Sequence, residues 1–209
     1  AAFWSLNYDA LDDAADPRHG YRVGFRQEIA GLGGDVRFLK SEGSAEWYRH
    51  LVPARDLVGR LAARGGVISG LGTPLSFQDH FAGGSDVVRG FARDGFGPRD
   101  ASTGFHLGGT AFASATAEAA MPLPFIPPHL GFKGAVFADV GGVWAPDARK
   151  VAASGADVTG DDAALRAAVG AGILWNSPFG LLRADFAVPV VSHDGDRPQV
   201  FTFTGGTRF

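Results

Sequence analysis

The chain has 209 residues, among them 31 Gly and 12 Pro, and 45% of its residues are hydrophobic. This content is too apolar for a disordered linker, and the glycines follow no collagen-like period. With 19 Lys and Arg against 22 Asp and Glu, the net charge of −3 argues against a basic face for nucleic acid. The absence of Cys excludes disulfides, thiolate metal sites and cysteine nucleophiles. No apolar run reaches the roughly 18 residues of a transmembrane helix.

Apolar and polar residues alternate with a period of two along most of the chain. In residues 182–190, for example, Leu182, Ala184, Phe186 and Val188 share one face, and Arg183 lies on the other. Several segments exceed the roughly 10 residues with which a tilted strand crosses a bilayer, whereas soluble strands are usually shorter. The pattern predicts about nine strands, at 3–10, 20–30, 35–50, 55–70, 106–122, 130–144, 163–177, 179–190 and 198–209.

The predicted connections are unequal on the two sides of the sheet. Short turns are expected near 11–19, 51–54, 123–129 and 178, and long loops at 71–105 and 145–162. Bacterial outer-membrane barrels have short periplasmic turns and long extracellular loops. If the last strand ends in the periplasm, an odd strand count places residue 1 outside. We therefore expect further strands to precede this chain.

Three stretches carry a resemblance to a known family. The first is residues 81–91, in which Gly83-Gly84 precede Arg89-Gly90-Phe91; the second is 134–144, with Asp139; the third runs from 169–180 to the terminal Phe209. In this order and spacing they resemble the BamA family of the bacterial surface antigen superfamily, in a form similar to alphaproteobacterial members. The TamA family and the two-partner secretion translocators share parts of the pattern.

The resemblance implies an all-β fold, an antiparallel transmembrane β-barrel of about 16 strands with a long extracellular loop folded into the lumen. Residues 1–209 would be the C-terminal portion of one barrel domain, with about nine strands; the first strands and the N-terminal periplasmic domains would be absent. It further implies a Gram-negative outer membrane, where the protein inserts unfolded β-barrel clients. The expected partners are outer-membrane lipids, these clients, and assembly-complex lipoproteins that bind the missing periplasmic domains.

The phase of the alternation points two acids into the expected lumen. Glu118 shares its face with Ser114 and Thr116, and Asp139 lies opposite in phase to Val136. In the family, the arginine of the loop tip meets inward acids, which makes Arg89 the expected partner of both. We interpret this cluster as one that positions the loop, with Gly83, Gly84 and Gly90 allowing left-handed backbone and close approach to the wall. The alternative is a solvated arginine above acids that only line a lumen.

The predicted last strand places Phe201, Phe203 and Phe209 on one face. In the family, this strand is a recognition signal for assembly and closes the barrel at a weak seam. Gly205 and Gly206 should weaken its pairing or bend it, because glycine packs poorly in a strand.

Sequence patterns of catalysis and metal binding are missing. The six His residues are scattered, and no Gly-x-Ser-x-Gly elbow occurs. Arg183 and Asp185 are expected to contribute polarity to the barrel wall rather than acid–base catalysis. We therefore expect no enzyme activity, no cofactor and no metal. Two alternative functions stay open: a polypeptide translocator or pore of the same superfamily, and a soluble all-β binding module.

Overall fold

A computed structural model describes residues 1–31, 37–72, 75, 77–145, 158–160, 163–178 and 180–206. Nine antiparallel strands form one sheet in the order β1-β2-β3-β4-β6-β7-β9-β10-β11. Their bounds are β1 Ala2–Asp9, β2 Gly20–Ala30, β3 Phe38–Val52, β4 Leu57–Gly70, β6 Ala111–Pro122, β7 Phe132–Trp144, β9 Arg166–Ser177, β10 Gly180–Val191 and β11 Phe201–Gly206. The nine predicted strands are thus confirmed, with shifted ends.

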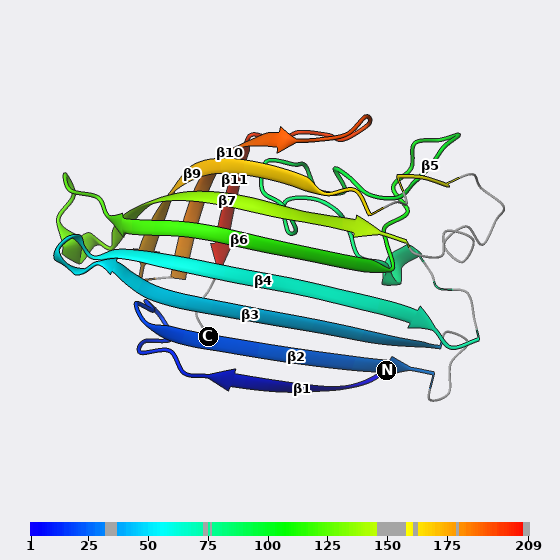
Figure 1. Cartoon of the computed structure of the whole chain (residues 1–209), viewed down its shortest axis with the longest axis horizontal. Helices are drawn as coiled ribbons and strands as arrows, with labels where there is room; N and C mark the ends of the chain where they lie inside the picture. The colour runs from blue at the N-terminus through cyan, green and yellow to red at the C-terminus, as the bar shows by residue number, and fades with distance from the viewer. Residues whose placement is uncertain are drawn as a thin grey trace.

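Each strand of this sheet pairs with the next one along the chain, so the sheet is a meander with β1 and β11 at its two edges. Figure 1 shows the sheet bent into a trough, with the segment between β4 and β6 inside the curve. Short turns join the strands at one end, two of them containing 3-10 helices, Pro53–Arg55 and Pro128–Leu130. A third 3-10 helix, Phe77–Asp79, lies in the long loop at the other end.

Two predicted boundaries differ from the structure. The segment expected at 106–122 becomes a strand only at Ala111, because Gly108 has a φ of 70° and Gly109 bridges to Phe81 in the loop. A separate antiparallel pair of two-residue strands, β5 (Arg99–Asp100) with β8 (Val158–Thr159), was not predicted. The predicted strand residues 35–36 and 207–209 lie outside the described residues.

The molecule is apolar on its convex face and polar inside. Large hydrophobic side chains such as Leu61, Val136, Val169 and Phe186 are exposed on the outside, each more than 45% accessible. A surface of this kind requires apolar surroundings. The buried apolar cluster instead lies inside the curve, where the long loop packs against the wall: Phe38, Ile68, Leu75, Phe81, Val87, Val88, Phe91, Phe96, Phe112, Val143 and Ala168. In the described residues, no helix is long and apolar enough to span a membrane.

Candidate functional site

The loop between β4 and β6 is a packed structure. The backbone amides of Val87 and Val88 both donate to the carbonyl of Gly84, at 2.9 Å, which forms a tight turn ahead of Arg89. Val88, Phe91 and Phe96 are fully buried, and the two phenylalanine rings meet edge to face at 5.1 Å. Burial of these apolar side chains holds the loop tip against the inner wall.

The glycines of the loop allow close contacts. A Cβ on Gly83 would lie 2.2 Å from the carbonyl oxygen of Phe96, and one on Gly84 would lie 2.5 Å from that of Ala92. Gly90 has a φ of 91°, in the region that favours glycine, and packs on Ala187 of the wall. Of these three glycines only Gly90 has left-handed backbone, and the expectation of it at Gly83 and Gly84 was wrong; there the need is for space.

The structure brings Arg89 together with Asp139 in a two-pronged ion pair. The Nε and Nη2 groups of Arg89 donate to the carboxylate of Asp139 at 2.7 and 2.8 Å. The backbone N–H of Arg89 donates to the same carboxylate at 3.2 Å, and the Thr116 hydroxyl donates at 2.9 Å. Four donors therefore fix Asp139, and a two-pronged pair of this type fixes direction as well as distance.

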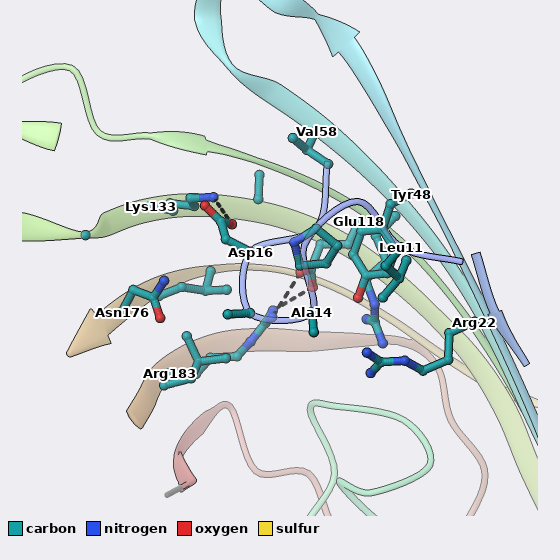
Figure 2. Close-up of a pocket in the computed structure, with 17 residues that line it drawn as sticks. Leu11, Ala14, Asp16, Arg22, Tyr48, Val58, Glu118, Lys133, Asn176 and Arg183 are labelled. Atoms are coloured by element: carbon teal, nitrogen blue, oxygen red, sulfur yellow. Dashed lines mark hydrogen bonds and ion pairs between the residues drawn. The ribbon is translucent and has the colours of Figure 1, made fainter. Parts of the chain in front are cut away.

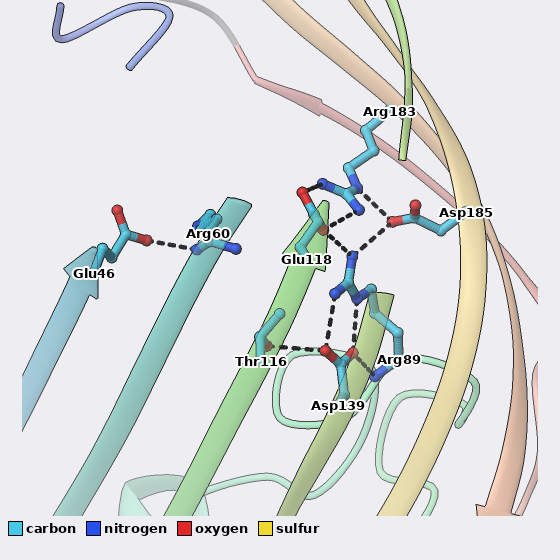
Figure 3. A network of polar contacts seen from close by, with 8 residues as sticks. All are labelled: Glu46, Arg60, Arg89, Thr116, Glu118, Asp139, Arg183 and Asp185. Atoms are coloured by element: carbon cyan, nitrogen blue, oxygen red, sulfur yellow. Dashed lines mark hydrogen bonds and ion pairs between the residues drawn. The ribbon is translucent and has the colours of Figure 1, made fainter. Parts of the chain in front are cut away.

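Arg89 also reaches Glu118, which it shares with a second arginine. Its Nη1 donates to Glu118 at 3.0 Å, and Arg183 donates two further bonds to Glu118, at 3.0 and 2.7 Å. Arg183 in turn binds Asp185 at 2.6 Å. Figure 3 shows the five side chains converging from the loop and from β6, β7 and β10. We call Arg89, Glu118, Asp139, Arg183 and Asp185 the lumen cluster.

The lumen cluster is largely shielded from water. The carboxylate side chains are only 2–5% exposed and the two guanidiniums 15% and 16%. The ring of Phe137 supports both guanidiniums, with its centroid 3.4 Å from Cζ of Arg89 and 5.6 Å from that of Arg183. In such surroundings an ion pair contributes little net stability, but removing one partner leaves a buried charge and costs about 3–5 kcal/mol.

The sequence analysis missed the part that Arg183, Asp185 and Phe137 take in this cluster. Period two already pointed Arg183 and Asp185 inward, and that was the available signal. It could not show that β10 faces β6 across the trough, because contacts between residues 65 positions apart depend on the curvature of the sheet.

The loop tip is also bonded to the segment that leads into the edge strand β11. The backbone amide of Gln199 donates to the carbonyl of Gly90, and that of Ala92 donates to the carbonyl of Arg197, both at 2.9 Å. Phe91 and Pro198 form a bridge between them. Arg89-Gly90-Phe91 therefore contacts both the acids of the wall and the chain just before β11.

Strand β11 lies at the edge of the sheet and reaches the last residue that the structure describes. It pairs with β10 from Phe186↔Phe201 to Leu181↔Gly206, so Gly205 and Gly206 are both in the ladder. Phe201 packs on Phe186 with ring centroids 5.0 Å apart. Phe203 is 63% exposed on the outer face, and Phe209 lies outside the described residues. The predicted residues of this strand are thus separate from the lumen cluster.

A second polar cluster closes the opposite end of the trough. The β1–β2 turn folds over the opening, where Arg18 makes a two-pronged pair with Asp56 at 2.8 and 2.9 Å, and Asp16 pairs with Lys133 of β7. His50 bonds to Asp56 at 2.7 Å. Beneath the turn lies a cavity of about 360 Å³ that Glu118 and Arg183 also line, as Figure 2 shows. Arg18 holds the pKa of the Asp56 carboxyl well below its ordinary value. We call Arg18, His50 and Asp56 the turn clamp.

Within the described ranges, no group of three or more His, Asp or Glu side chains is arranged to hold a metal ion. The candidate site therefore consists of the ion pairs of the lumen cluster and the edge strand β11.

Comparisons with known proteins agree with this geometry. The chain is 36% identical to the outer membrane protein assembly factor BamA of Neorickettsia risticii, over 97% of the chain and 26% of that protein. It is 27% identical to BamA of Neisseria meningitidis, over 99% of the chain and 28% of that protein. The crystal structure of BamA from Haemophilus ducreyi lacking POTRA domains 1–3 superposes with a TM-score of 0.82 at 25% identity, over 98% of this chain and 41% of that one.

The chain spans about a quarter of the length of the curated relatives that it matches, at 26% and 28%. The profile of the Omp85 superfamily domain matches residues 2–209. This match, together with the nine-stranded meander and its inward-folded loop, establishes that the chain belongs to the Omp85 superfamily.

Proposed function

We propose that this chain is the C-terminal part of a barrel domain that inserts β-barrel proteins into the outer membrane of a Gram-negative bacterium. Its clients are unfolded outer-membrane barrel proteins, and its outer face contacts lipid. Assembly-complex lipoproteins would bind periplasmic domains that lie outside this chain. The action proposed is physical handling of strands, with no catalytic chemistry.

The observation that carries the proposal is the double attachment of the loop tip. Arg89 is tied to Asp139 and Glu118 inside the trough, and Gly90 is hydrogen-bonded to Gln199 just before β11. We infer that the lumen cluster positions the loop so that it holds the start of the edge strand. A movement of the loop would then also change how the start of the edge strand β11 is held.

An edge strand offers unpaired backbone groups to an incoming strand. Within the described residues, β11 pairs with Leu181–Phe186 of β10, and the pairing ends with the bond from the Ala187 amide to the Val200 carbonyl, short of Val191. Glycines at 205 and 206 add no side-chain packing to the ladder. These features support β11 as the replaceable side of a seam, where a client strand is held by main-chain hydrogen bonds.

A second candidate function is polypeptide translocation, which the polar inner surface of the trough supports. A cavity of about 390 Å³ beside the loop is lined by Arg64, Ser114, Thr202 and Thr204, among others. Such a lumen would suit passage of an extended chain if the loop moved away. The named relatives above are assembly factors, which favours the first candidate.

The test is insertion of a client barrel into liposomes that contain the full-length protein. Protease protection of the client measures insertion, for the wild type, for Arg89→Glu and for Arg93→Glu. Arg93 lies on the same loop with an exposed side chain, and so it controls for charge reversal alone. We expect the wild type and Arg93→Glu to accelerate insertion and Arg89→Glu to lose most of that acceleration.

Equal acceleration by Arg89→Glu would contradict the role given to the loop tip. No acceleration by the wild type, with a measurable ion conductance that rises when the loop is deleted, would favour the translocator.

A further inference from the structure

A pocket on the loop side of the molecule lies apart from the lumen cluster. It has a volume of about 450 Å³ and lies between the β4–β6 loop and the segment that joins β10 to β11. Its lining includes two guanidiniums, Arg99 and Arg197, two imidazoles, His80 and His106, and the carboxylate of Asp94. Neither the family resemblance nor the proposed function uses this pocket.

Both guanidiniums are held by backbone carbonyls of one short segment. Nη2 of Arg99 donates to the carbonyl of Gly95 at 2.6 Å, and Nη2 of Arg197 donates to that of Asp94 at 2.9 Å. The acceptors belong to consecutive residues, so the two side chains approach one place from different segments. Arg99 also donates to the carbonyl of Gly195, which joins both walls of the pocket.

These guanidiniums have no carboxylate partner in the part of the chain that the structure describes. The nearby Asp196 binds Arg166 instead, at 3.2 Å, and both of those side chains are 4% exposed. Asp94 faces Nδ1 of His106 at 3.7 Å and is 42% exposed, so its charge is well solvated. Asp100 is engaged by Ser102 and Thr103 of its own turn.

Among the described residues, the positive charge of Arg99 is therefore poorly compensated. Burial, reinforced by the neighbouring Arg197 and Arg166, holds the pKa of Arg99 below its ordinary value despite the presence of Asp196. Burial lowers the pKa of His106, although the bond from its Nε2–H to the carbonyl of Phe96 acts in the opposite direction. A partly buried cation such as Arg99 is stabilised by an anion that fills the space between it and the exposed Arg197.

We propose that this pocket binds a phosphate-type oxyanion between Arg99 and Arg197. Each guanidinium retains N–H groups that the backbone carbonyls do not use, because it has five and donates one or two here. A tetrahedral phosphate can accept from two guanidiniums at once, a geometry for which arginine is well suited. The phosphate could belong to a lipid headgroup of the outer leaflet or be free in solution, and both would use the same contacts.

The experiment measures phosphate binding by the full-length protein in detergent, in buffer free of phosphate and sulfate. Inorganic phosphate is the first probe. Its binding is measured by ³¹P NMR line broadening and by the rise in thermal midpoint that a ligand of the folded state causes. Phosphatidylcholine nanodiscs with and without lipid A form a second arm, with lipid A lacking its phosphates as the control. The variants are Arg197→Gln, Arg99→Gln with Arg197→Gln, and Arg93→Gln as the matched control.

We expect wild type and Arg93→Gln to bind equally, Arg197→Gln to bind at least about tenfold more weakly, and the double variant to show no binding. A signal with inorganic phosphate assigns a free anion, and a signal only with phosphorylated lipid A assigns a headgroup. Arg197 is exposed, so its single variant tests the site even if the double variant fails to fold. The proposal is overturned if the wild type binds neither probe, or if Arg197→Gln binds as well as Arg93→Gln. Client insertion is not the readout, so this result stands apart from that of the proposed function.

Discussion

The lumen cluster and the turn clamp use the same chemistry at the two ends of one trough. In each, an arginine from a connecting segment makes a two-pronged pair with an aspartate, Arg89 with Asp139 and Arg18 with Asp56. Their surroundings differ. The side chains of Arg89 and Asp139 are 15% and 2% exposed, whereas those of Arg18 and Asp56 are 40% and 27% exposed.

Burial, rather than hydrogen-bond geometry, therefore decides what such a pair does. In the turn clamp, water solvates a charge that loses its partner, so the pair contributes about 0–1 kcal/mol. In the lumen cluster, loss of Arg89 leaves three carboxylates facing one guanidinium away from water. The first pair adds a little to the stability of a turn, and the second determines where a loop can lie.

The largest effect is expected for Arg89→Ala. The docked loop should become less stable by about 3–5 kcal/mol, because Asp139 loses its charged partner in a buried place. Hydrogen exchange of the amides in residues 84–96 would measure this as a local opening free energy. Arg93→Ala, on the same loop, is the control. Unchanged protection in Arg89→Ala would show that the apolar contacts alone hold the loop.

A second test asks whether space matters as much as charge at the loop. Gly83→Ala should destabilise the docked loop by about 1–3 kcal/mol, because its Cβ would overlap the Phe96 carbonyl. Gly43→Ala in β3 is the matched control, since nothing lies within 4 Å of its added Cβ. Hydrogen exchange of the amides in residues 84–96 measures this loss of stability as well. A Gly83→Ala variant as protected as Gly43→Ala would mean that the turn relaxes without cost.

A smaller, pH-dependent effect is expected at the turn clamp. Asp56→Asn should lower stability at neutral pH by about 1 kcal/mol or less, while asparagine still tolerates the φ of 48°. The folded-state pKa of Asp56 is lowered, chiefly by Arg18, so its contribution is full above the unfolded pKa of about 3.9 and is lost as pH falls below it. Thermal midpoints of the two proteins should therefore begin to converge as the pH falls below about 5 and continue to do so down to the lowered folded-state pKa of Asp56. A constant difference across that range would contradict the assignment.

The smallest effect is expected for Arg22→Gln. Arg22 pairs with Asp9 at 2.7 Å, but the two side chains are 40% and 45% exposed. Water and salt screen such a pair, so the thermal midpoint should not change measurably. A loss as large as that of Asp56→Asn would show that exposure alone does not rank these pairs.

The strands and the direction of their side chains follow from the local pattern of the sequence. Because the side-chain period of a strand is two, Glu118 and Asp139 had to share the polar face and Val136 the apolar one. The Arg89-Gly90-Phe91 motif pointed to the loop tip through family resemblance. These are local properties, legible from residues that are close together in the chain.

Which polar residues meet depends instead on the three-dimensional fold. The curvature of the sheet brings Arg183 of β10 to Glu118 of β6, and the path of the loop brings Gly90 to Gln199. The same holds for the turn clamp and for the arginines of the proposed phosphate pocket, which come from segments about 100 residues apart. Such contacts depend on how strands twist and close around a lumen, and the alternation of residues along one strand carries no information about that geometry.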